Sequence, residues 1–214
     1  ELDFSVEESL KKIRETALMG RWAEARSLAD EELTHSQQPQ LFMGAAMMHF
    51  CAGDRQGAKR LFSQSLSMDD ENNVAKLMLY LIDWLADPKA ERSYRTELLA
   101  LDWRSPAEFQ GYLVKVLEGL VDEAAALDGW YSTSEKIWLN YAVALIQSRQ
   151  TEWPVAEKSL REAVRLGETD GWEFILARSE LEATQKRRRK TLDSEAQLVE
   201  YDADIETFEQ QVRK

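Results

Sequence analysis

Alanines recur at intervals of about 33 residues along this chain of 214 residues, and this repeat constrains the fold more than any other feature. The alanines are Ala25, Ala58, Ala90, Ala124 and Ala156, at spacings of 33, 32, 34 and 32. In four of the five registers, apolar or aromatic residues follow four and eight positions later, which is one and two turns of a helix. A small residue lets two backbones approach closely, so the repeat predicts stacked helical hairpins.

The repeat and the positions of turn residues predict an all-α chain. We expect five hairpin units at about 5–38, 39–72, 73–104, 105–133 and 134–167, of which 105–133 is the least regular. A capping helix is expected at 168–185, and a basic run with a short coiled-coil-like helix at 186–214. The expected helices are Val6–Met19, Trp22–Leu33, Gln40–Cys51, Arg55–Ser67, Asn73–Ala86, Pro88–Leu101, Pro106–Leu117, a short turn to Leu127, Ser134–Arg149, Pro154–Leu166 and a long helix from Trp172 onward.

The chain resembles the tetratricopeptide repeat (TPR) family, whose pattern is W-x2-L-G-x2-Y followed by A-x3-F. The second unit matches it in relaxed form with Phe42, Ala45, Ala46 and His49, followed by Ala58 and Phe62. The fifth unit matches with Trp138, Tyr141, Ala142 and Leu145, followed by Ala156 and Leu160. The resemblance covers about residues 5–167 and implies a right-handed superhelical solenoid.

The charge balance limits the class of partner. The chain holds 27 Lys and Arg against 39 Asp and Glu, a formal net charge of −12. Phosphate binding needs a cationic surface, so this acidic composition argues against nucleic acid as the main partner. No apolar run reaches the roughly eighteen residues of a membrane helix, so we expect no transmembrane segment. One cysteine and no signal-like stretch favour the cytoplasm, although a removed leader or anchor would leave the same sequence.

The usual catalytic patterns are missing from the sequence, which has no phosphate-binding glycine loop, no G-x-S-x-G and no H-E-x-x-H. His49 is expected to be a packed, hydrogen-bonded core residue rather than a ligand. Cys51 is expected to be a small buried apolar residue, because a nucleophile would need a base beside it. We therefore predict a chain that is not an enzyme and that holds no cofactor and no metal.

The TPR resemblance implies a concave groove lined by the first helix of each unit, in which a partner peptide or helix binds. Methionines and aromatic residues exposed in such a groove would form an adaptable apolar surface. The alternative is that neighbouring helices or the C-terminal segment bury them. The candidate groove residues are Met43, Met47, Phe50, Lys76, Tyr80, Asp83, Trp84, Lys136, Leu139, Val143 and Ile146.

The C-terminal segment has two features of its own. Lys186–Lys190 are five consecutive cations, which could contact nucleic acid or anionic lipid, but which we expect to form a solvated helix face or to pair with acidic groups of the repeats. Beyond them, apolar residues recur at spacings of 3, 4, 3 and 4, as in the seam of a coiled coil about two heptads long. This seam could pair with a second copy, bind a partner helix or fold back along the groove. Its residues are Leu198, Tyr201, Ile205, Phe208 and Val212.

Together these features predict a non-catalytic adaptor or scaffold that binds a peptide or helix of another protein in the groove of the array. The alternative is a structural assembly subunit that forms homo-oligomers through its C-terminal helix.

Overall fold

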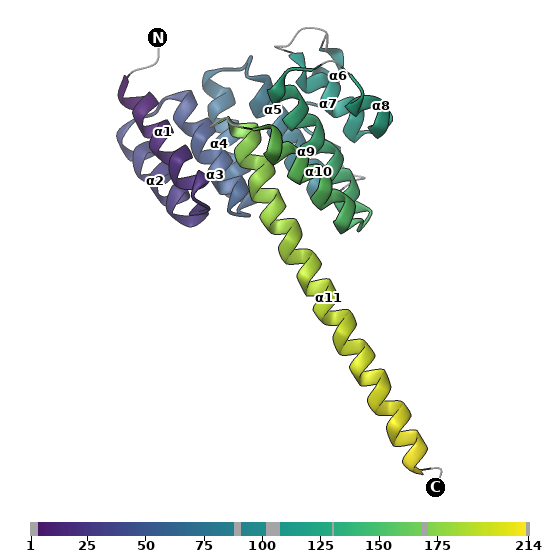
Figure 1. Cartoon of the computed structure of the whole chain (residues 1–214). Helices are drawn as coiled ribbons and strands as arrows, with labels where there is room; N and C mark the ends of the chain where they lie inside the picture. The colour runs from purple at the N-terminus through teal and green to yellow at the C-terminus, as the bar shows by residue number, and fades with distance from the viewer. Residues whose placement is uncertain (1–3, 88–90, 102–107, 130, 168–170, 213–214) are drawn as a thin grey trace.

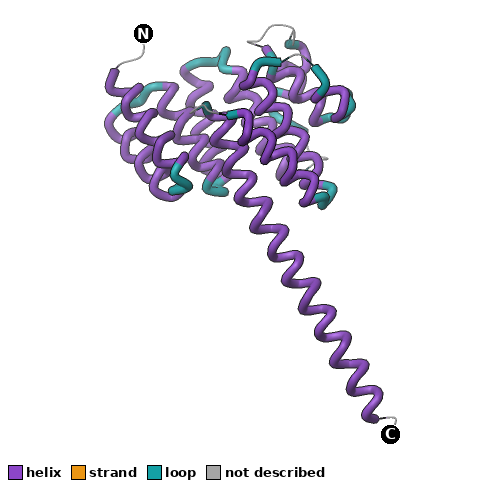
Figure 2. The backbone as a smooth tube through the Cα atoms, viewed as in Figure 1, coloured by secondary structure: helices purple, strands orange, loops and turns teal. Residues whose placement is uncertain are grey.

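The structure, a computed structural model of the chain, describes residues 4–87, 91–101, 108–129, 131–167 and 171–212. For Phe4 and residues 193–212 it describes the backbone alone. The described residues form helices joined by short loops, with no strand among them (Figure 2). The prediction of an all-α chain is confirmed.

Most of the predicted helices are found within two residues of their expected ends. They pack one against the next to form an array of helical hairpins that runs from α1 to α10 (Figure 1). The helices of the array are α1 (Phe4–Leu18), α2 (Trp22–His35), α3 (Pro39–Cys51), α4 (Arg55–Met68), α5 (Asn73–Ala86), α6 (Arg95–Ala100), α7 (Gln110–Leu117), α8 (Glu123–Leu127), α9 (Thr133–Arg149) and α10 (Trp153–Leu166).

The predicted helix Pro88–Leu101 is wrong in its first half. The backbone from Glu91 to Tyr94 is not helical, and α6 begins only at Arg95. Two features of this segment explain the difference. Tyr94 has a left-handed backbone with φ of 60°, and the Asp83 carboxylate accepts a hydrogen bond from the backbone N–H of Ser93 at 3.0 Å. The expected starts at Pro88 and Pro106 lie outside the described residues.

The repeated alanines are buried where the hairpins are regular. Ala25, Ala58 and Ala156 are each 0% exposed, as close helix packing requires. Ala90 lies outside the described residues. The assignment of Ala124 to this role is wrong, because Ala124 is exposed and Ala126 is the buried residue of α8. In this unit α7 and α8 are short, so loops make up part of the repeat length of about 33 residues. The repeat position therefore does not mark the buried face of a helix here.

The last helix, α11 (Trp172–Val212), is 41 residues long and has two different environments. Its first part packs against α10, α9, α3 and α1, and it buries Ile175, Leu176 and Ala177. Its second part leaves the array as a single straight helix (Figure 1). The expected boundary at residues 185 and 186 is not a break, because the helix continues through it.

A matched pair of substitutions tests this packing. Ala58→Leu forces extra methylene groups into a site without space and should destabilise the chain by about 1–3 kcal/mol. Ala124→Leu, at the equivalent repeat position but exposed, should change stability by less than about 0.5 kcal/mol. Urea denaturation followed by circular dichroism measures the free energy of unfolding of both variants. Equal losses of stability would contradict the close packing around Ala58.

Candidate functional site

The apolar residues predicted to line an open groove are for the most part buried. Exposure is 8% for Met43, 0% for Met47, 0% for Tyr80, 4% for Trp84, 0% for Leu139 and 1% for Val143. Phe50, Lys76, Asp83 and Ile146 are half-buried, and only Lys136 is exposed. These apolar side chains are therefore buried within the chain, which was the alternative to an open groove. Their role in binding a partner stays a prediction, and it requires that what covers them move.

The first part of α11 packs against α3 and α9, two of the helices that carry predicted groove residues. Ser179 on α11 donates a hydrogen bond to the backbone carbonyl of Cys51, at 3.2 Å, at the end of α3. Near the middle of α3, Gly44 has no side chain, and a Cβ there would lie 2.6 Å from Leu10 and 3.4 Å from Trp172. This absence of a side chain lets α1, α3 and α11 meet closely. Helix α11 is thus part of the core rather than a loose cap.

The groove residues of α5 are covered differently. The Tyr80 hydroxyl donates a hydrogen bond to the Glu118 carboxylate at 2.7 Å, and the Arg92 guanidinium lies over the Tyr80 ring at 5.8 Å. The Arg149 guanidinium lies over the Trp84 ring at 4.1 Å. Cation–π contacts of this kind place a charge over the face of an aromatic ring, so that this face is covered within the chain.

Glu118 is the centre of a network that the sequence did not reveal. It accepts from Tyr80, pairs with Arg92, and accepts from Nε of Arg95 at 3.2 Å. Burial alone would raise the pKa of Glu118, but the hydrogen bonds from Tyr80, Arg95 and Arg92 outweigh it and lower that pKa. Its partners lie 23 to 38 positions away in the sequence, so no local pattern marks the network.

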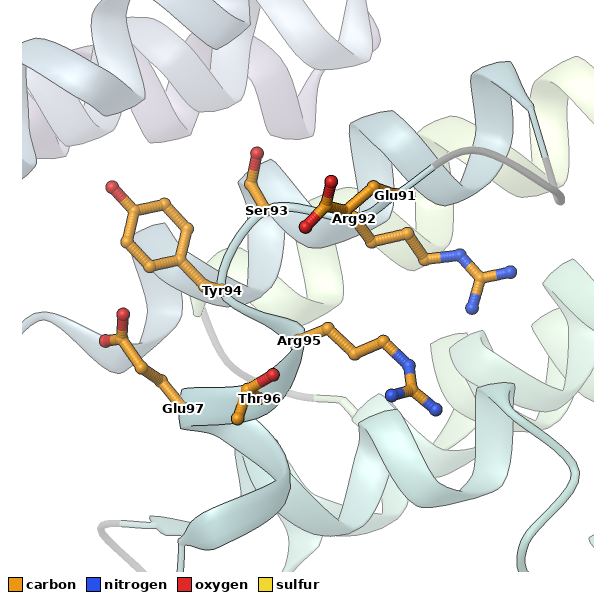
Figure 3. A pocket seen from close by; sticks show the side chains of 7 residues that line it. All are labelled: Glu91, Arg92, Ser93, Tyr94, Arg95, Thr96 and Glu97. Atoms are coloured by element: carbon orange, nitrogen blue, oxygen red, sulfur yellow. The ribbon is translucent and has the colours of Figure 1, made fainter.

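The loop before α6 forms a hollow of about 450 Å3 beside this network (Figure 3). Arg92 and Arg95 extend to one side of the loop, and Tyr94 and Glu97 to the other. Arg92 and Arg95 both pair with Glu118, so these two cations share one carboxylate within the chain. The hollow is lined by Glu91, Arg92, Ser93, Tyr94, Arg95, Thr96 and Glu97.

His49 is a packed, hydrogen-bonded residue, as predicted. Its side chain is 7% exposed. Its Nδ1 lies 2.8 Å from the Asp54 carboxylate and its Nε2 lies 2.8 Å from the Asp30 carboxylate. The contacts join α2, α3 and the start of α4, where Asp54 also accepts from the backbone N–H of Gly57. The hydrogen bond from Gly57, together with His49, lowers the pKa of Asp54.

Cys51 lies where α3 meets α11. Burial raises the pKa of its thiol to about 12, against a weaker opposing effect of the Ser179 hydrogen bond. The side chain is half-buried rather than fully buried as expected, and the raised pKa disfavours a thiolate at neutral pH. The rate at which this thiol is alkylated can instead measure whether α11 stays packed on the array.

The basic run pairs with acidic groups of its own chain, one of the two arrangements expected for it. Arg187 donates to Glu180 at 2.5 Å, and Arg188 donates to Glu157 of α10 at 2.8 Å. The Arg188–Glu157 pair holds the middle of α11 against the end of the array, whereas the Arg187–Glu180 pair lies within α11 itself. Arg187 and Arg188 are therefore engaged within the chain.

Glu157 receives three partners. Besides Arg188, it accepts from Arg161 at 2.6 Å and from Gln185 at 3.2 Å, with its side chain 10% exposed. The hydrogen bonds from Arg161 and then Arg188 hold the pKa of Glu157 down at about 2. This carboxylate is the point where α10 fixes α11 before the helix leaves the array.

The apolar seam falls in the part of α11 for which only the backbone is described. The helix is continuous through Leu198–Val212, so the seam positions share one side of a helix. This segment extends away from the array and does not fold back onto it (Figure 1).

The described residues hold no group of three or more His, Cys, Asp and Glu side chains suited to a metal ion. Among the described helices, none has both the length and the apolar character needed to cross a membrane. No protein-family model matches the sequence, and no curated protein or solved structure is detectably similar to it.

Alkylation of Cys51 tests whether α11 covers it. In a Met19→Cys variant the same molecule carries an exposed thiol, because Met19 is 63% exposed. Cys51 should react on the order of a hundredfold or more slowly than Cys at position 19, since its thiolate is rare and shielded. Iodoacetamide labelling with peptide mass spectrometry gives both rates, and equal rates would mean that α3 is open to solvent at this point.

Glu157→Gln should lower the melting temperature at pH 7, because Arg161 and Arg188 lose their shared anion. The pKa of Glu157 is lower in the folded chain than its usual 4.5. Its stabilising effect is therefore present above pH 4.5 and is lost as the pH falls toward 2. The gap between wild type and variant should shrink over that range.

Glu162→Gln is the matched control, because Glu162 pairs with Arg165 on the same helix but is 43% exposed. It should change the melting temperature little at any pH. A gap for Glu157→Gln that stays constant from pH 7 to pH 2 would contradict the assignment.

Proposed function

We propose that this chain is a non-catalytic protein-interaction scaffold with a TPR-like array, and that it binds a helix of a partner protein through the projecting part of α11. One observation carries the proposal. The first part of α11 is built into the core, and the remaining helix stands away from the array (Figure 1). In the sequence of this remaining helix, apolar residues recur at spacings of 3 and 4.

The physical argument is that a helix of about 20 residues is marginal alone in water. Continuation from an anchored helix removes the cost of nucleation, so the array holds the projecting part ready for docking. An apolar seam at spacings of 3 and 4 gains free energy when a second helix covers it. The array then serves as the anchor that sets the direction of this helix.

Docking of a peptide in the concave groove is less well supported. A ligand there would have to displace α11 and expose Ile175, Leu176 and Ala177, which are at most 2% exposed. It would also break the pair between Arg188 and Glu157. These losses oppose any groove ligand that leaves α11 without a new partner.

The second candidate is an assembly subunit that forms homo-oligomers, and the same projecting helix favours it. Molar mass separates the two. Light scattering on the full chain gives the mass of one copy, 24.7 kDa, for a scaffold that awaits another protein. A multiple of that mass, which returns to one copy in a chain ending at Leu192, identifies the assembly subunit.

A capture experiment tests the docking element. The immobilised full chain should retain proteins from an extract of its source cells that Ile205→Asp and the chain 1–192 fail to retain, by roughly tenfold or more. Ala203→Asp introduces the same charge at a position away from the seam and should retain them. If the chain 1–192 retains the same proteins as the full chain, the array binds the partner and the proposal is wrong.

A further inference from the structure

We infer that the projecting part of α11 selects an amphipathic helix with basic residues beside its apolar seam, in preference to a second copy of this chain. The inference rests on the proposed function, because it takes the seam as the docking surface. It follows from the charges that flank the seam.

Residues adjacent to a coiled-coil seam set the choice of partner, because they lie beside the same positions of the other helix. The flanking positions here are Gln197, Asp202, Asp204, Glu209 and Gln211, of which three are acidic and none is basic. Between residues 191 and 212 there are seven Asp and Glu and no Lys or Arg. The flanks of the seam therefore carry one sign of charge.

Self-pairing brings these like charges together in either orientation. In a parallel pair, Asp204 comes beside the second copy's Glu209. In an antiparallel pair centred on the seam, Asp202 comes beside the second copy's Asp202, and Asp204 comes beside the second copy's Asp204. Like charges at such positions destabilise a pair. A helix with Lys or Arg at the facing positions turns each repulsion into an attraction.

The chain's own basic run does not relieve the repulsion. An antiparallel pair shifted to set Lys190 opposite the second copy's Asp202 places the apolar seam opposite Ser194, Thr191 and Arg187 of that copy. This register loses the apolar burial that drives pairing. Arg187 and Arg188 are, besides, engaged with Glu180 and Glu157. Charge and apolar pattern together favour a foreign helix with basic flanks.

The test uses the full chain as its own reference. A variant with Asp204→Lys and Glu209→Lys carries basic flanks on the same seam. Mixed with the wild type, it should form a one-to-one heterodimer at least about tenfold more tightly than wild type pairs with itself. Sedimentation equilibrium at high chain concentration measures each pairing. The heterodimer should weaken with added salt and disappear when Ile205→Asp is added to the variant.

Glu200→Lys with Glu206→Lys is the matched control, with the same change of charge at outer positions of the helix. It should give no heterodimer beyond the weak self-pairing of the wild type. If this control pairs as strongly as the flank variant, net charge rather than position drives association and the inference fails.

The remaining outcomes separate this inference from the proposed function. If the wild type forms a dimer alone that Ile205→Asp abolishes, the seam docks helices but its flanks do not exclude a second copy, and only the inference falls. If no mixture associates through the seam, the projecting helix is not a docking surface, and both fall.

Discussion

The burial of the first part of α11 among α1, α3, α9 and α10 is the interaction on which the rest of the structure depends. Ile175, Leu176 and Ala177 are at most 2% exposed. Thr184, about two turns further along the same side of the helix, is 0% exposed. Apolar burial of this kind is worth about 25 cal/mol for each Å2 removed from water, so three or more turns make a large contribution. Because α11 joins the two ends of the array, it fixes the hairpins relative to one another. It also directs the remaining helix away from them.

The hairpins could be predicted from the sequence because their signals are local. Helical periodicity and turn residues located most helices within two residues, and the buried Ala25, Ala58 and Ala156 fit the repeat. The repeat failed at Ala124, where short helices break the relation between spacing and burial. It also failed before α6, where contacts between residues distant in the helix pattern, such as Asp83 with Ser93, shape the loop.

The burial of the residues predicted to line a groove could not be foreseen from local patterns. Whether Met47 or Leu139 faces a partner or another part of the chain depends on which helices pack around α3 and α9, and one of those helices, α11, comes more than 30 residues later. Periodicity gives the face of a helix but not its neighbour. The same holds for Glu118 and Glu157, whose partners come from other helices. The seam at Leu198–Val212 was visible in the sequence, and what the structure adds is that the helix carries it away from the array (Figure 1).

Hydrogen exchange of backbone amides tests the central claim, that α11 is core in its first part and free in its second. Amides of Ile175–Thr184 should exchange as slowly as those of α9, since both open only when the array unfolds. Amides of residues 193–212 should exchange many times faster, at rates close to those of an isolated helix. Equal, fast exchange along the whole of α11 would show that the helix is not held by the array, and the account of an anchored docking helix would be wrong.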